Sequence, residues 1–408
     1  MIRPAWLTRP SLSWALYDFA NTIFSMSVVT LYFPLFLVQT LGYREYWLSL
    51  GLSLSMGLAA VASPFVGSAS DRRIGKNVIL AVATSLCCIA TLLIPASGHL
   101  AGVLAAFVAA NFLYQVSLVA YDSLLPSATD EGHYGPVSGF GVALGYIGTF
   151  LALIIGKLLV TTPADNGRVF LPTAICFLLF ALPCFFVKDL KRSQTSPIRV
   201  ADTAREIIRD RDLRWYFAGH LLYLDAVNTV IAFMAVFLVK VGGFSQAKGE
   251  VNYFLMFSTI FAVIGGLFWG WLVRRRGART GLLATLALWI AALGMVCLPL
   301  AKEHYWILGP LSGIALGGVW SCDRPLLLDM VPRERAGSFF GFYYLTGKFS
   351  SVVGPLLFGA ILALPLGTEA IRYRLAFFSL LIMVIVATAC IAHIRPKQAA
   401  PQLQAGDP

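Results

Sequence analysis

The sequence predicts an all-α membrane protein of twelve transmembrane helices, arranged as two pseudo-symmetric bundles of six. Three observations support this fold class. Of the 408 residues, 58% are hydrophobic and only 12% are charged, whereas an average soluble domain has roughly 25% charged residues. Apolar runs of about 20 residues, long enough to cross the hydrocarbon core of a bilayer, recur along the chain. A polar cluster also occurs twice, half a chain apart.

This repeated cluster places an acid, an amide and a hydroxyl inside an apolar segment. The first copy is Asp18, Asn21 and Thr22, and the second is Asp225, Asn228 and Thr229, at one common offset (225 − 18 = 207). A repeat at this scale in a membrane chain indicates a duplicated helix bundle, the usual construction of secondary transporters, whose substrate sites lie between the halves. We therefore expect both clusters to face one central cavity.

Charged residues, Gly and Pro separate the apolar runs and set the predicted boundaries. The first six spans are predicted at 14–39, 46–70, 77–96, 100–125, 137–161 and 169–187. The second six are predicted at 215–240, 251–273, 280–300, 306–331, 338–364 and 373–394. The predicted domains are an N-terminal bundle (1–187), a cytoplasmic linker (188–214), a C-terminal bundle (215–394) and a disordered cytoplasmic tail (395–408).

The linker admits two interpretations. It carries eight basic and five acidic residues. The stretch from Ala201 to Arg211 could form a short helix on the membrane surface, because mixed charges accompany Ile207 and Ile208. A solvated charged connection explains the same composition.

The distribution of basic residues predicts the orientation in the membrane. The side with both termini and the linker carries 21 Lys and Arg residues, and the opposite side carries seven. Both termini are therefore expected in the cytoplasm. Because much of the net charge of +11 is explained by this topology signal, we expect no nucleic-acid partner. The predicted partners are the lipid bilayer, a small-molecule solute and protons, and the chain is expected to act as a monomer.

Several classes of function lack support in the sequence. The seven cysteines all fall inside predicted spans, without a C-x-x-C pair or clustered histidines, so we expect neither disulfides nor a metal site. No nucleotide-binding motif accompanies the spans. We expect no cofactor and no enzymatic activity.

Charges inside the spans are the strongest indications of function, because each costs several kcal/mol at the bilayer centre unless it faces a cavity or a partner. Eight qualify, namely Asp18, Asp122, Lys157, Asp225, Asp323, Arg324, Asp329 and Lys348. Lys157 is near the outer end of its span and can extend its ammonium group toward the headgroups. The others require protein or water around them.

The acid cluster of the first span forms a polar stripe. Asn21, Thr22 and Ser25 follow Asp18 at i+3, i+4 and i+7, so all four lie on one face of an apolar helix. The seventh span repeats the pattern, with His220 and Tyr223 nearer its cytoplasmic end. A role in the cavity or gate is one interpretation, and a static hydrogen-bond network between helices is the other.

A second repeat lies in the loops after the second and eighth spans. The first copy runs from Gly67 through Asp71, Arg72 and Arg73 to Lys76. It resembles the cytoplasmic G-x-x-x-D-R signature of the major facilitator superfamily. In the second copy, Gly270 is followed by Arg274 and Arg275, so an arginine stands in the position of the acid.

This resemblance implies a set of latches. Asp71 would meet the eleventh helix when the cytoplasmic side is closed, and Arg72 or Arg73 would pair with Asp122. Asp323 could serve Arg274 or Arg275 in the same way. Both Asp122 and Asp323 could instead bind substrate.

Longer motifs resemble one branch of that superfamily, the vacuolar amino-acid effluxer (autophagy-related) family and its bacterial relatives. The motifs are Trp14 to Asn21, Tyr121 to Pro126, Ser138 to Gly148, Leu222 to Thr229 and Phe339 to Tyr343, followed by Gly347-Lys348 and Gly354-Pro355. The chain departs from the family at Asp122, where an amide is commoner, and at Asp323-Arg324-Pro325, where Ser-Arg-Ser is commoner. It also lacks the long lumenal extensions of the fungal members, which favours a bacterial inner-membrane protein.

The expected function is secondary transport of a small polar solute, with amino acids as one class, by alternating access. A zwitterion needs a cation for its carboxylate and an acid for its amine. Arg324 and Lys348 are the candidate cations, and Asp18 and Asp225 are the candidate acids. Lys348 could equally lock the two halves together. A multidrug or other metabolite exporter of the same fold is the alternative, and a membrane sensor or scaffold is a second.

Overall fold

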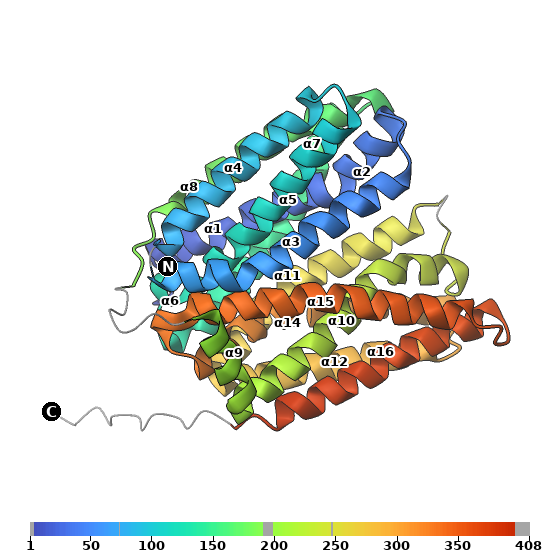
Figure 1. Cartoon of the computed structure of the whole chain (residues 1–408). Helices are drawn as coiled ribbons and strands as arrows, with labels where there is room; N and C mark the ends of the chain where they lie inside the picture. Colours follow the sequence, from blue (N-terminus) through green and yellow to red (C-terminus); the bar gives the residue numbers. More distant parts are fainter. Residues whose placement is uncertain (1–3, 73, 191–198, 246–247, 396–408) are drawn as a thin grey trace.

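The computed structural model describes residues 4–72, 74–190, 199–245 and 248–395. Long helices account for most of these residues, and no β-strand occurs in the described ranges. The predicted all-α class is thus confirmed. The helices form two bundles that lie side by side, the first coloured blue to green and the second yellow-green to red (Figure 1).

The first bundle begins with a span that is not one regular helix. It comprises α1 (Arg9–Phe24), η1 (Ser25–Tyr32), α2 (Phe33–Leu35) and η2 (Phe36–Thr40), of which η1 and η2 are π-helical. Pro34 lies in α2 and has no N–H group to donate, which accounts for an interruption at this point. The helix start is well defined, because the Thr8 side chain accepts a hydrogen bond from the Ser11 backbone.

The other five spans of the first bundle are single helices. They are α3 (Glu45–Arg72), α4 (Lys76–Ala96), α5 (Leu100–Ser123), α7 (Tyr134–Leu159) and α8 (Phe170–Phe185). Short helical turns in the connections are α6 (Leu125–Ala128), η3 (Glu131–His133) and η4 (Pro163–Val169).

The second bundle repeats this order. Its spans are α10 (Arg211–Lys240), α11 (Glu250–Arg276), α12 (Ala278–Cys297), α14 (Leu308–Met330), α15 (Ala336–Ala363) and α16 (Glu369–Ala392). Two short turns, α13 (Lys302–Tyr305) and η5 (Arg333–Arg335), precede α14 and α15. Within the described ranges, eleven helical segments are long and apolar enough to cross a membrane. The twelfth, α14, has 23 residues but carries Asp323, Arg324 and Asp329.

The linker contains helix α9 (Val200–Arg209), so the structure shows the short helix rather than an irregular connection. α9 packs against α3, α10 and α15 and thus touches both bundles. Arg335 reaches Glu206 of α9 at 2.7 Å. Asp210 ends this helix and caps the next, because its side chain accepts from the Leu213 backbone N–H at 2.9 Å.

The two bundles are closest at the end that holds the N-terminus and α9, which we call the linker end (Figure 1). The helix pairs α3 with α15 and α7 with α11 make most of the contact between the bundles, and α7 with α14 and α5 with α15 add to it. A Cβ atom on Gly67 would overlap the carbonyl oxygen of Gly337 and lie 3.1 Å from the Cα of Gly341. A Cβ atom on Gly139 would lie 2.9 Å from the Cα of Gly270. Glycine is therefore required at both crossings, where one backbone lies against another.

Candidate functional site

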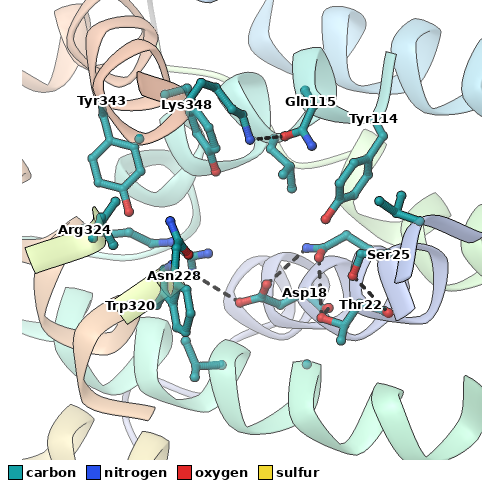
Figure 2. A pocket seen from close by; sticks show the side chains of 18 of the residues that line it. Asp18, Thr22, Ser25, Tyr114, Gln115, Asn228, Trp320, Arg324, Tyr343 and Lys348 are labelled. Atoms are coloured by element: carbon teal, nitrogen blue, oxygen red, sulfur yellow. Dashed lines mark hydrogen bonds and ion pairs between the residues drawn. The ribbon is translucent and has the colours of Figure 1, made fainter. Parts of the chain in front are cut away.

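A cavity of about 460 Å³ lies between the bundles. Its polar and aromatic lining comes from α1, η1, α5 and α7 on one side and from α10, α14 and α15 on the other (Figure 2). Of the sequence-predicted cavity residues, six line it, namely Asp18, Asn21, Thr22, Asn228, Arg324 and Lys348. Three others, Tyr223, Asp225 and Thr229, are not among the lining residues.

The stripe on α1 faces the cavity as its spacing predicted. The Asn21 amide donates to Oδ1 of Asp18 at 3.1 Å. The Thr22 hydroxyl donates to the Asp18 backbone carbonyl at 2.8 Å, which ties it to its own helix. Asp18 is only 6% exposed. Its carboxylate therefore sits in a pocket of protein groups, where a negative charge requires a partner.

Arg324 supplies that partner from the opposite bundle. Its Nη1 lies 3.1 Å from Oδ2 of Asp18, and its Nε lies 2.9 Å from Oδ1 of Asp122. Tyr344 of α15 donates to the other carboxylate oxygen of Asp122 at 2.5 Å. One buried guanidinium thus joins two acids of the first bundle, and its positive charge is compensated by both. We call Asp18, Asp122 and Arg324 the ion triad.

The matching cluster on α10 is arranged differently. Oδ1 of Asp225 accepts a hydrogen bond from the backbone N–H of Gly354 at 2.7 Å. The Thr229 hydroxyl donates to the Asp225 carbonyl at 2.7 Å. The cluster therefore binds α10 to α15 inside the second bundle. Asn228 is the member that lines the cavity.

The structure corrects two expected pairings. Asp122 meets Arg324, not Arg72, and Arg73 lies outside the described residues. Asp323 meets neither Arg274 nor Arg275, both of which are exposed. It instead accepts hydrogen bonds from Tyr216 at 2.6 Å and Tyr223 at 2.5 Å, with Nε2 of His220 at 3.4 Å. For Asp323 the reason is depth, because it is fully buried whereas Arg274 and Arg275 are exposed. For Asp122 the reason is competition, because Arg324 lies closer to it inside the cavity wall.

Asp71 makes the contact that the family resemblance implies. Its carboxylate accepts from the backbone N–H groups of Gly337 at 3.0 Å and Ser338 at 2.6 Å, and from the Ser338 hydroxyl at 2.8 Å. These groups are at the N-terminus of α15, where unpaired amides and the helix dipole favour an anion. Lys76 lies 3.3 Å away and balances the charge. With Gly67 in van der Waals contact nearby, this arrangement joins the two bundles at the linker end.

Lys348 occupies a separate side of the cavity. Its Nζ donates to Oε1 of Gln115 at 2.6 Å and lies 5.9 Å from the centre of the Tyr344 ring. Within the described part of the chain it forms no ion pair with Asp18 or Asp225. Figure 2 shows the Lys348–Gln115 pair across the cavity from Asp18 and Thr22.

Gln115 and Tyr344 were not identified from the sequence. Gln115 is an amide inside an apolar span, and it is 3% exposed, so the cost of burying a polar group could have indicated it. Tyr344 carries no comparable signal, because tyrosine is common in membrane helices. The described residues include no group of three or more His, Cys, Asp or Glu side chains that could hold a metal ion. All seven cysteines are free thiols.

Comparison with known proteins places the chain in a family. The "Uncharacterized MFS-type transporter YxiO" of Bacillus subtilis is 25% identical over 95% of each chain. "Autophagy-related protein 22" of Eremothecium gossypii is 24% identical over 93% of this chain and 89% of its own. A crystal structure of a bacterial homologue of the iron transporter ferroportin, in an outward-facing state, has a TM-score of 0.74 at 15% identity, covering 95% of this chain and 99% of that one.

The family profile agrees with these likenesses and with the predicted resemblance. It matches two overlapping ranges, residues 22–355 and 247–407, which together take in nearly the whole chain. The fold shared with the solved transporter fits the two six-helix bundles described above. This chain therefore belongs to the Major Facilitator Superfamily.

Proposed function

We propose that this chain is a secondary transporter that moves a small polar solute through the cavity between its bundles by alternating access, with amino acids as one candidate class. The observation that carries the proposal is the ion triad. It places a cation of the second bundle between two acids of the first, 3.1 Å from Asp18 and 2.9 Å from Asp122. A rocking motion of the bundles must break or rearrange these contacts, which makes the site sensitive to what occupies it.

The bundles supply the moving parts of the proposed mechanism. Residues 1–187 and 215–394 would move as two bodies joined by the linker 188–214, with the tail 395–408 in the cytoplasm. We infer from the basic-residue bias that the linker end is cytoplasmic. The Asp71 contacts hold that end together, so this conformation would be closed to the cytoplasm. Asp71, with Gly67, would act as its latch.

An ion gradient is the proposed energy source. Protons are the candidate coupling ion, because Asp18 and His220 are buried ionisable groups, 6% and 0% exposed. Asp225 is a third candidate, although its carboxylate is held by Gly354. A transport rate that does not respond to collapse of the proton gradient would exclude this coupling.

A multidrug exporter is the alternative, since aromatic side chains also line the cavity, among them Tyr114, Tyr146 and Trp320. The polar groups of the lining, such as Asn21, Thr22 and Lys348, favour a polar solute, because a large apolar drug would displace water from them without replacing its hydrogen bonds. A sensor or scaffold would need no solute cavity. We also propose that the chain acts as a monomer in a bacterial inner membrane.

The deciding test is counterflow of labelled amino acids in proteoliposomes, with the native chain, Asp18→Asn and the matched control Asp130→Asn. Asp130 is an exposed loop acid, so its amide should transport at the native rate. Counterflow by the native chain and the control, lost in Asp18→Asn, would support an amino-acid carrier that uses this cavity. Absence of counterflow from folded native protein would remove amino acids as the solute class.

A further inference from the structure

The charges around the cavity are unequally satisfied. Each acid of the triad uses both of its oxygens. Asp18 holds Asn21 on Oδ1 and Arg324 on Oδ2. Asp122 holds Arg324 on Oδ1 and Tyr344 on Oδ2. Asp18, the acid among the described lining residues, is therefore already paired with a cation.

Lys348, in contrast to the acids of the triad, has no charged partner among the described residues. An ammonium group has three donors and no acceptor, yet its hydrogen bond within the described part of the chain is to the neutral amide of Gln115. The Tyr344 ring adds a weak attraction at 5.9 Å. A cation in an intramembrane cavity is costly without a counter-charge. An anionic group on a solute would form the ion pair that no acid in the described part of the chain makes with Lys348.

The surroundings of Lys348 indicate what kind of anion fits. Arg324 lies between two carboxylates, so the triad carries a net charge of −1. Lys348 is the lining cation that no acid of the described residues contacts directly. Asp18 faces the same cavity and repels a second negative charge. Apolar side chains such as Met56, Leu118 and Leu224 cover other parts of the wall. This combination fits a singly charged group on a partly apolar body.

We propose that Lys348 is the docking point for a carboxylate on the transported solute, and that an amino group on the solute is dispensable. The inference rests on the proposed function, because it assigns the ligand of the same cavity. It sharpens that function, since the solute class becomes small monocarboxylates, with or without an amine. Gln115 positions the Lys348 ammonium group from the opposite bundle.

Three probes on one carbon skeleton separate the contributions of the two charges. They are 3-phenylpropanoate (carboxylate alone), phenylalanine (carboxylate and amine) and phenylalaninamide (amine alone), with inorganic phosphate as a different anion. Binding is read from the rise in Tm of the purified full chain with probe concentration. Both carboxylates should bind with similar apparent Kd, and the amide and phosphate should bind at least about tenfold more weakly.

Variants test whether Lys348 makes the contact. Lys348→Gln should weaken binding of both carboxylates by about 10- to 100-fold, the range expected for a hydrogen bond to a charged group. Lys348→Arg should recover part of it. The matched control is Lys157→Gln, because Lys157 is an exposed lysine of α7 that does not line the cavity. It should bind like the native chain.

Each contrary result has a defined meaning. Four results would each overturn the proposal. They are equal binding of phenylalanine and phenylalaninamide, tighter binding of phosphate than of the carboxylates, failure of one or both carboxylates to bind, and unchanged carboxylate binding in Lys348→Gln. A Lys348→Gln chain that loses stability without probe, by more than Lys157→Gln does, would show that Lys348 locks the bundles instead. Carboxylate binding at Lys348 without counterflow in proteoliposomes would retain this inference and reject the proposed transport.

Discussion

The clusters on α1 and α10 have the same three residue types at the same spacing, but they do different things. Asp18 faces the cavity and pairs with Arg324 of the opposite bundle. Asp225 is not among the residues that line the cavity, and it accepts a hydrogen bond from the backbone N–H of Gly354 in its own bundle. The two halves of the chain keep the acid at the same position along the helix, but the group that contacts the acid differs between them. The lesson is that an internal repeat predicts location more reliably than role.

Removal of Arg324 should have the largest effect on this comparison. Arg324→Gln leaves Asp18 and Asp122 buried without their cation, which we expect to cost about 3–5 kcal/mol of stability. The measurement is unfolding of the purified protein in detergent. The double variant Arg324→Gln with Asp122→Asn should recover part of the loss, because it removes one of the stranded charges. Equal stability of Arg324→Gln and the exposed-site control Arg275→Gln would contradict the assignment of a triad.

The second largest effect should be a difference in counterflow between variants of Asp18 and of Asp225. Asp18→Asn should lower counterflow at least about tenfold, because it removes a charge that pairs with Arg324 across the cavity. Asp225→Asn should keep counterflow within about twofold, since an amide oxygen can still accept from Gly354. Comparable losses in both variants would show that the two clusters share one role after all.

The latch should show a smaller, conformational effect. Asp71→Asn removes the charge and leaves one acceptor oxygen where the carboxylate has two, so at least one of the three hydrogen bonds from Gly337 and Ser338 is lost. It should destabilise closure of the linker end by about 1.5–3 kcal/mol. Spin labels at Ile74→Cys and Arg276→Cys, in a cysteine-free background, report the separation of the bundles at that end. A longer distance population should appear in Asp71→Asn and be absent with Asp130→Asn. Identical distance distributions would remove the latch role.

Much of the fold followed from the sequence because spans are local properties of composition. Twelve apolar runs predicted the twelve helices, although the ends moved by several residues. The first span shows the limit, because the π-helical turns of η1 and η2 around Pro34 are not visible in hydropathy. Polar stripes correctly indicated interior faces, since lipid cannot satisfy them.

Partners within the site were harder to predict, for a physical reason. Arg324 and Asp18 are 306 residues apart, so their pairing depends on how the two bundles pack and leaves no trace in local spacing. Tertiary packing likewise brings Asp323 within hydrogen-bonding distance of the hydroxyl groups of Tyr216 and Tyr223. Gln115 was missed because a single amide forms no motif. Sequence thus located the charges but not the neighbours that decide their chemistry.

The repeated loops after α3 and α11 resemble the two clusters in keeping one feature of the repeat and losing another. Substitutions in the second loop should have the smallest effect on stability. Gly67 and Gly270 both lie where two backbones meet, so the glycine role is the same in both copies. The role of the acid is not shared by the second copy, because Arg274 stands in the position of Asp71 and is exposed. Exchange of Arg274 and Arg275 together to Gln should change stability by less than about 0.5 kcal/mol, as at other surface positions. An effect as large as that of Asp71→Asn would mean that the second loop is also a latch, reached in a conformation other than this one.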